Sequence, residues 1–379
     1  MTHDDEQRLT QALKTQITRW VNLESPSHDS TALGRMAAII ESDALDVGLQ
    51  VERLDLGPDT GPALHIHNRA RHDDRSGILV LGHYDTVHPI GTLEKNPCRQ
   101  EGNRLYGPGI YDMKAGVCLA LHALGLLAEP QATTLPIDLL LLPDEETGSH
   151  YSRPTIEDFA RRAVFALVAE PARAEGGRCV TARKGTGHIY VTAQGQASHA
   201  GIAHDKGQNA IEEMAHQILA LQKMTNYEVG TTVSVGTIKG GTTSNVVPDR
   251  CHIVADFRVV DENSAQALKQ EVQALQAHNP NVVLDVRFEL NRPAMPRTEE
   301  TAALLKKCQQ FALQAGFALE EAPRTGGASD ANFTAALRVP TLDGLGADGN
   351  GAHTLNEHIL VSTLAQRARF WHYTLAGLS

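Results

Sequence analysis

The sequence predicts an α/β protein in which a smaller domain is inserted into a larger one. Apolar runs at 77–87, 137–143 and 164–170 have the character of buried strands separated by helices, which indicates a sheet covered by helices on both faces. From about residue 187 the pattern changes to alternating strands and longer polar helices. A chain of 379 residues is long enough for two domains.

The larger domain is predicted to contain further elements on both sides of the insertion. We expect them from their amphipathic or apolar patterns: helices at 5–22, 31–48, 114–128 and 298–315, a strand at 337–346 and a C-terminal helix. A glycine-rich loop, TGGASDAN at 325–332, precedes that strand. We therefore assign 1–185 and 293–379 to this domain.

The inserted segment, 186–292, is predicted to be a complete small domain. Its elements follow the order β-α-β-β-α-β, which is the ferredoxin-like arrangement. The stretch NRPAMPR at 291–297 contains two prolines and is a candidate hinge back into the larger domain.

Composition and charge exclude several kinds of partner. The formal net charge of -11 argues against nucleic acid or an anionic membrane surface, because such partners require a basic face. The amino terminus lacks the pattern of a secretory signal, and no apolar run approaches the length of a membrane span. The five cysteines are scattered without a CxxC pair, which favours a reduced, cytoplasmic protein over a disulfide framework or a cysteine-held zinc.

Polar side chains gather where the predicted strands end, and ligands of open α/β sheets usually bind at that edge. These candidate residues are His83, Asp85, Asp144, Glu145, Glu146, Glu170 and His353, joined by Asp112 at the start of a helix. Histidine nitrogens and carboxylate oxygens without cysteine suit a catalytic zinc or similar divalent ion. The set exceeds what one tetrahedral site needs, which suggests two metals that share a bridging carboxylate.

Each of these residues also has a purely structural interpretation. A histidine at a strand end is usually a satisfied surface group, and acids after a strand usually cap a helix. Asp112 could be an N-cap, and Glu170 an exposed loop acid. What favours the functional interpretation is the joint occurrence of all of them, in order, at predicted strand ends.

The motifs that carry these residues resemble a known family. They are GHYDTV, GPGIYDMKAG, PDEETGS, AEP, GQASHAG, NVVPD, DFR, GGASDAN and GAHTLNEH. Together they resemble the di-zinc aminoacyl-hydrolases, a family that includes glutamate carboxypeptidase, acetylornithine deacetylase, succinyl-diaminopimelate desuccinylase and carnosinase. The resemblance covers essentially the whole chain. It implies a zinc-peptidase-type catalytic domain with a mixed sheet covered by helices, and an inserted domain that serves as lid and dimerisation element.

The resemblance implies a role for each candidate metal ligand. Asp112 would bridge two zinc ions, for which cobalt or manganese could substitute. His83 and Glu170 would complete one metal site, and Glu146 and His353 the other. In this family the peptide bond after the bridging aspartate is typically cis, so Asp112–Met113 is expected to be cis.

The remaining catalytic roles are implied in the same way. Asp85 resembles the acid that orients the His83 ring, and Glu145 the general base that acts on a metal-bridged hydroxide. His199 would reach a substrate carbonyl, in dimeric relatives from the neighbouring subunit. Asp144 has no assigned role beyond a cap or a supporting hydrogen bond.

Substrate contacts are expected from the inserted domain and the glycine-rich loop. Asn245 and Arg258 resemble the family's substrate-binding residues, with Arg258 clamping a terminal carboxylate. On sequence alone, Arg258 could equally be a charge at a strand edge. The loop around Gly327 should approach the substrate closely, because glycines allow backbone contact.

The leading hypothesis is therefore a homodimeric metallopeptidase that removes a C-terminal amino acid from a short peptide or an N-acyl amino acid. The alternative within this chemistry is an N-acyl-amino-acid deacylase such as acetylornithine deacetylase, and an aminopeptidase is a third. A non-catalytic binding protein with the same fold is disfavoured because every proposed ligand and the base are present. The preferred leaving amino acid and the physiological metal stay open.

Overall fold

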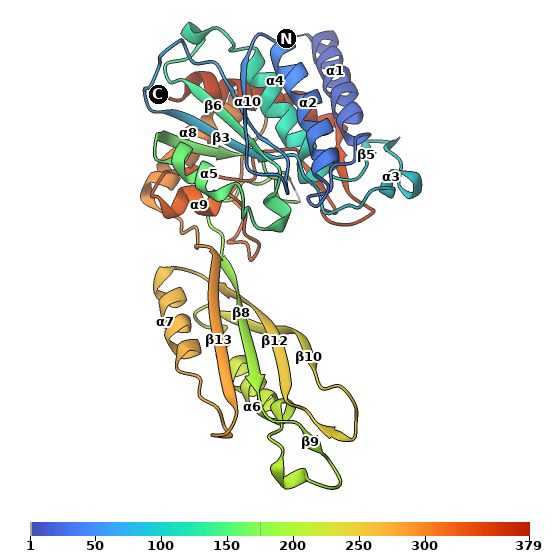
Figure 1. Ribbon diagram of the computed structural model, residues 1–379. Helices are drawn as coiled ribbons and strands as arrows, with labels where there is room; N and C mark the ends of the chain where they lie inside the picture. The colour runs from blue at the N-terminus through green and yellow to red at the C-terminus, as the bar shows by residue number, and fades with distance from the viewer. Residues whose placement is uncertain (1, 175) are drawn as a thin grey trace. The chain divides into compact units, whose positions relative to one another are not determined.

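The computed structural model describes residues 2–174 and 176–379, which form two compact units (Figure 1). The first unit combines the chain up to Ala182 with Arg297–Thr325 and Ser329–Ser379. The second unit consists of Arg183–Pro296 and the short segment Gly326–Ala328. The predicted insertion, 186–292, lies wholly within the second unit.

A six-stranded mixed sheet forms the centre of the first unit. Its strands, in spatial order, are β1 (Gln50–Leu54), β2 (Ala63–His67), β6 (Ile137–Leu142), β3 (Gly77–His83), β7 (Ala163–Val168) and β14 (Thr341–Leu342). The β1–β2 and β2–β6 pairs are antiparallel, whereas β6, β3, β7 and β14 run parallel. The mixed sheet that the resemblance implies is therefore confirmed.

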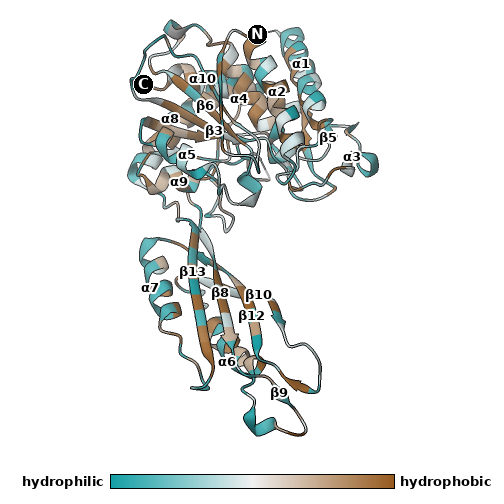
Figure 2. Cartoon of the chain, in the orientation of Figure 1, coloured by the Kyte–Doolittle hydropathy of each residue, from teal (hydrophilic) through white to brown (hydrophobic). Residues whose placement is uncertain are grey.

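Burial explains why the central strands read as continuous apolar runs. Every residue of β3 and β6 is buried, and both strands are largely brown in the hydropathy colouring of Figure 2. Strands covered on both faces have no polar side to present to water, so their sequences lack alternation. This pattern made the central strands visible in the sequence.

Helices cover this sheet. They are α1 (His3–Val21), α2 (Ser30–Asp46), α4 (Ala115–Gly125), α5 (Arg153–Ala160), α8 (Glu299–Ala315), α9 (Ala331–Ala336) and α10 (Leu364–Gly377). The helix α1 begins at a capping box, in which Thr2 and Asp5 satisfy each other's backbone N–H groups. The prediction of a strand over the whole of 337–346 is wrong: only Thr341–Leu342 form a strand, because α9 and a turn occupy the residues before it.

A second, small sheet supports the loop that contains His353. Its strands are β15 (Gly349–Asn350), β16 (His358–Leu360), β5 (Arg104–Tyr106) and β4 (Arg99–Glu101), a four-stranded arrangement in which neighbours are antiparallel. The loop between β15 and β16 includes His353, whose backbone has a positive φ of 63°. For a residue other than glycine this conformation is uncommon and concentrates at functional sites.

The second unit is built on an antiparallel sheet of four strands, in the order β10-β12-β8-β13. Along the chain its elements are β8 (Gly185–Gln194), α6 (Ala210–Lys223), β10 (Thr232–Gly240), β12 (Arg250–Val259), α7 (Glu262–Gln273) and β13 (Val283–Arg292). This is the predicted β-α-β-β-α-β order. A short ribbon of β9 (Ser198–His199) and β11 (Val246–Val247) is added to it.

Among the described residues, no helix is long and apolar enough to cross a membrane. The five cysteines are free thiols, and four of them are buried.

A buried carboxylate links β2 to β6 in the first unit. Asp138 on β6 accepts a hydrogen bond from Arg69 Nε at 2.6 Å and lies 2.9 Å from His65 Nε2. Burial by itself would raise the pKa of Asp138, but the hydrogen bonds from Arg69 and His65 outweigh it and lower the pKa to about 2. The ionised carboxylate is therefore part of what holds these strands together.

We expect Asp138→Asn to lower the free energy of unfolding of the first unit by about 2 kcal/mol at neutral pH. The reason is that the pKa of Asp138 is lower in the folded than in the unfolded chain, and an asparagine loses this contribution. Because the folded pKa lies below the unfolded value of about 3.9, this contribution is present above that value and is lost as pH falls towards about 2. Urea denaturation at several pH values measures it, with the exposed Asp158→Asn as the control. A wild-type advantage that stays constant down to pH 2 would contradict this assignment.

Candidate metal centre

The carboxylate of Asp112 lies between two groups of potential metal ligands. Its Oδ1 is 3.2 Å from His83 Nε2, which in turn lies 3.8 Å from Glu170 Oε1. Its Oδ2 is 3.3 Å from His353 Nε2, which lies 3.1 Å from Glu146 Oε2. Within each trio the ligand atoms are all within 4.8 Å of one another. The structure thus brings the five predicted ligands together around one shared side chain.

Parallel strand ends position three of these side chains. His83 is the last residue of β3, Glu146 lies just after β6, and Glu170 just after β7. The register of β3 with β6 and β7 aligns these carboxyl ends at one edge of the sheet. Helix α4 reaches the same edge because Gly116 has no side chain: a Cβ there would lie 2.1 Å from the Ala169 carbonyl oxygen. The candidate site therefore lies where open α/β sheets usually bind ligands.

A buried acid that sequence reasoning missed holds the backbone of Asp112. Glu357, fully buried, accepts hydrogen bonds from the N–H groups of Tyr111 at 2.8 Å, Asp112 at 2.9 Å and Gly109 at 2.9 Å. Its second oxygen also lies 2.8 Å from His88 Nε2. The peptide bond Asp112–Met113 is cis, as expected. The available signal was the motif GAHTLNEH, in which Glu357 follows His353 by four residues.

Asp85 connects the first histidine to the acidic loop after β6. The carboxylate is fully buried and accepts hydrogen bonds from the N–H groups of Glu145 and Glu146, both at 3.2 Å, and from the Ser27 hydroxyl at 2.6 Å. It also lies 3.3 Å from His83 Nδ1. One side chain therefore positions a candidate ligand and the loop that contains the candidate base.

The tautomer of His83 follows from its surroundings. Nδ1 is 3.0 Å from the backbone carbonyl of Asp85, which can only accept a hydrogen bond, so the proton of a neutral ring belongs on Nδ1. The lone pair of Nε2 is then directed at Asp112 and Glu170. This is the arrangement that a metal-binding histidine requires.

Asp144 belongs to the backbone turn and not to the ligand groups. This residue is buried, and its carboxylate accepts hydrogen bonds from the N–H of Tyr151 at 2.7 Å, the N–H of Ser152 at 3.3 Å and the Ser152 hydroxyl. Burial raises the pKa of Asp144. Its role is to hold the turn that leads into α5.

Electrostatics at the site favour a bound cation. Burial raises the pKa of Glu170 well above its ordinary value, and the negative charges of Asp112 and Glu145 raise it further. Hydrogen bonds to Asp112 and Glu146 raise the pKa of His353 to about 11. The Oε1 atom of Glu146 is buried without a hydrogen-bond partner. The carboxylates are crowded together with too little positive charge beside them. The histidine nitrogens and carboxylate oxygens of the cluster fit a divalent metal of the zinc type.

Glu145 lies beside this cluster without belonging to either ligand trio. Its side chain is half-buried, and its negative charge raises the pKa of both His83 and Glu170. A carboxylate within electrostatic reach of the ligands, on a loop held by Asp85, is a candidate proton acceptor.

The four predicted substrate residues belong to the second unit. His199 and Asn245 are both exposed, and the Ala200 N–H donates to the Asn245 carbonyl at 3.0 Å, so the two predicted contacts are neighbours. Arg258 pairs with Asp256 on the same strand and donates to the Gly326 carbonyl at 3.3 Å. The Gly327 carbonyl accepts a hydrogen bond from Arg183 at 3.0 Å.

Comparison with known proteins places this chain among peptidases. Residues 79–377 match the model of the peptidase family M20/M25/M40. The chain is 31% identical over 356 residues to carboxypeptidase G2 of Pseudomonas sp. (strain RS-16), covering 93% of this chain and 85% of the relative. It is 30% identical over 362 residues to succinyl-diaminopimelate desuccinylase of Delftia acidovorans, covering 89% and 91% of the two chains.

Solved structures share the fold. A tripeptidase from Staphylococcus aureus superposes with a TM-score of 0.76 at 21% identity, over 97% of this chain and 98% of the other. An M20 family metallo-carboxypeptidase from Sulfolobus solfataricus does so with a TM-score of 0.74 at 16% identity, over 96% and 98%. The chain belongs to the peptidase family M20/M25/M40, and it is a metal-dependent hydrolase of amide bonds.

Proposed function

We propose that this hydrolase removes a C-terminal amino acid from a short peptide or an N-acyl amino acid, using two divalent ions of the zinc type. The observation that carries the proposal is the Asp112 carboxylate, whose two oxygens each face a separate pair of donors, one histidine nitrogen and one glutamate oxygen. A relative 31% identical, named carboxypeptidase G2, supports the proposal that the hydrolysed amide is the one that joins the C-terminal amino acid.

The five clustered side chains would hold the metals in two sets. His83 and Glu170 would bind one ion and Glu146 and His353 the other, with Asp112 shared between them. When bound, the metals supply Lewis acidity, which lowers the pKa of water and polarises a carbonyl oxygen. Cobalt and manganese accept the same donor types and are candidate substitutes.

The remaining residues would bind the substrate and transfer protons. Glu145 takes the proton of the attacking water and delivers it to the leaving amine, while Asp85 keeps its loop in place. His199 donates to the substrate carbonyl as negative charge develops on it. Arg258 would clamp the substrate's terminal carboxylate, beside the loop that contains Gly327. Asn245 would contact the substrate together with its neighbour His199.

A second candidate function is the deacylation of an N-acyl amino acid. The relative of 30% identity is named succinyl-diaminopimelate desuccinylase, and both reactions hydrolyse the same kind of amide. The two candidates differ in which half of the substrate is recognised. Cytoplasmic location and a homodimer formed through the inserted domain stay predictions.

A hydrolysis screen tests the proposal directly. Dipeptides and N-acyl amino acids are offered with zinc, cobalt or manganese, and we expect turnover of substrates that end in a free carboxylate. A substrate set defined by its acyl group, with little dependence on the released amino acid, would favour the deacylase instead. Absence of metal-dependent turnover across the whole panel would refute the proposal.

In the same assay, we expect Glu145→Gln to lower kcat by a factor of about 10² to 10⁴, because the amide cannot accept the proton. Metal content, measured by elemental analysis, should stay at the wild-type level, since Glu145 is not a proposed ligand. The exposed Glu94→Gln is the matched control. Activity within a few-fold of wild type would remove Glu145 from the role of general base.

Removal of the carboxylate clamp should affect binding in a substrate-dependent way. We expect Arg258→Ala to raise KM by about 10-fold to 100-fold for substrates with a free C-terminal carboxylate, as the loss of a charged hydrogen bond predicts. Amidated substrates should be affected little. Arg250→Ala, an exposed arginine on the same strand, is the control. An equal loss for both substrate types would identify Arg258 as structural, acting through Asp256 and Gly326.

Glu357 should act as a positioning residue for Asp112. In Glu357→Gln the amide nitrogen faces backbone N–H donors, so at least one hydrogen bond to the Asp112 segment is lost. We expect metal affinity to fall by about 10-fold to 100-fold, as for other residues that support metal ligands. Chelator titration measures the affinity, with the exposed Glu320→Gln as control. Unchanged chelator sensitivity together with a lowered thermal stability would show a purely structural role.

A further inference from the structure

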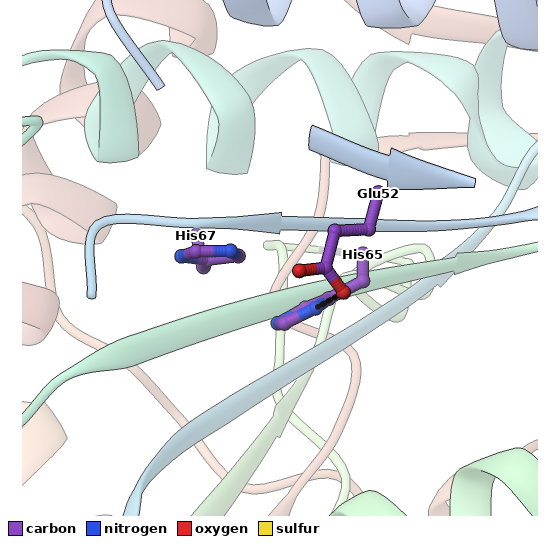
Figure 3. A group of neighbouring side chains, drawn as sticks. All are labelled: Glu52, His65 and His67. Atoms are coloured by element: carbon purple, nitrogen blue, oxygen red, sulfur yellow. Dashed lines mark hydrogen bonds and ion pairs between the residues drawn. The ribbon is translucent and has the colours of Figure 1, made fainter. Parts of the chain in front are cut away.

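A second group of potential metal ligands lies elsewhere in the first unit (Figure 3). It comprises Glu52 on β1 and His65 and His67 on β2, whose ligand atoms lie within 4.8 Å of one another. In the sheet register His67 is opposite Asp138, near the amino end of β6. The proposed catalytic ligands follow the carboxyl ends of β3, β6 and β7, so the two groups occupy different parts of the sheet.

His65 is held between two carboxylates. Its Nε2 lies 2.9 Å from Asp138, and its Nδ1 lies 3.4 Å from Glu52 Oε2. When Nε2 donates to Asp138, the Nδ1 lone pair faces a carboxylate that can also only accept. Two acceptors so placed repel each other, and a metal ion between them would relieve that repulsion. A metal-binding histidine usually donates its other ring N–H to a carboxylate. Here that carboxylate is Asp138, which Arg69 holds in place.

His67 adds a second nitrogen from the same face of β2. The rings of His65 and His67 stack with centroids 4.5 Å apart, and one nitrogen of His67 points toward the Glu52 carboxylate in Figure 3. The Nδ1 atom accepts a long hydrogen bond, 3.2 Å, from the Arg69 N–H. If a metal bound to Nε2, the ring proton would move to Nδ1. Metal binding would therefore cost only the hydrogen bond from the Arg69 N–H.

The surroundings are those of a site open on one side. Both histidines are buried, and the ring of Phe159 packs edge-on against His65 at 4.7 Å, whereas Glu52 is exposed. An ion could enter past Glu52, with water as its fourth ligand. Two imidazoles and one carboxylate suit zinc, cobalt or nickel, whereas calcium and magnesium prefer oxygen ligands.

We propose that Glu52, His65 and His67 bind one divalent transition-metal ion that is separate from the catalytic metals. The ion has a structural role, because Glu52 comes from the edge strand β1 and the histidines from its neighbour β2. An edge strand is paired on one side only, so a metal clip across this pair strengthens its weaker attachment. The proposal does not depend on the identity of the amide substrate.

Metal stoichiometry tests the proposal. The holoenzyme, with its catalytic site loaded and free metal removed, is titrated with Co²⁺ or Zn²⁺ by calorimetry, and Co²⁺ absorption reports nitrogen ligation. We expect one further equivalent per chain in wild type and its loss in Glu52→Gln and His67→Gln. The exposed His188→Gln should retain it. Added metal should raise the Tm of wild type and leave that of the two variants unchanged.

Hydrolytic activity separates this site from the catalytic one. The wild-type rate of the loaded enzyme should persist in Glu52→Gln, a substitution of an exposed side chain that also leaves folding undisturbed. The proposal is overturned if no further equivalent binds, if the further equivalent survives both Glu52→Gln and His67→Gln, or if loss of the equivalent is always accompanied by loss of activity.

Discussion

The position of one carboxylate, that of Asp112, is the constraint on which the candidate metal centre depends. A single aspartate can serve two donor groups only if its two oxygens face different histidines, and here they face His83 and His353. Those histidines are far apart in the sequence. The backbone before Asp112 must therefore be held firmly, and the buried carboxylate of Glu357 does so through three N–H groups. The supporting carboxylate is thus fully buried, whereas His353 at the site itself is exposed.

On the other side of the centre, the single carboxylate of Asp85 supports two groups. Its carboxylate accepts the N–H groups of Glu145 and Glu146 and also lies against the His83 ring. A displacement of this side chain would move a candidate ligand and the candidate base together. Supporting hydrogen bonds of this kind determine ligand orientation nearly as much as the ligands do.

Concentrated negative charge explains why the site suits cations. Isolated buried carboxylates are costly, and a group in that position either takes up a proton or acquires a positive partner. The raised pKa of Glu170 and the unpartnered oxygen of Glu146 both indicate a missing positive charge. The acids around His65 are balanced differently, because Arg69 already pairs with Asp138 and only Glu52 lacks a fixed cation. The buried Asp138 is thus neutralised by an arginine, whereas the exposed Glu52 is solvated.

The sequence by itself determined the α/β class, the order of elements in the inserted domain and the identity of the clustered side chains. It could do so because buried parallel strands leave long apolar runs, and because polar residues directly after such runs must lie at one edge of the sheet. The edge strand β1 and its neighbour β2, by contrast, are short and contain charged or histidine residues, so they leave no long apolar run in the sequence. The resemblance already implied that Glu146, and not Asp144, is a metal ligand. Only the tertiary structure showed the reason, because the turn directs Asp144 towards Ser152 and Glu146 towards His353. Only the fold, too, brought Glu357 beneath Asp112 and placed Glu52 opposite His65, because those contacts join residues whose separation along the chain carries no periodic signal.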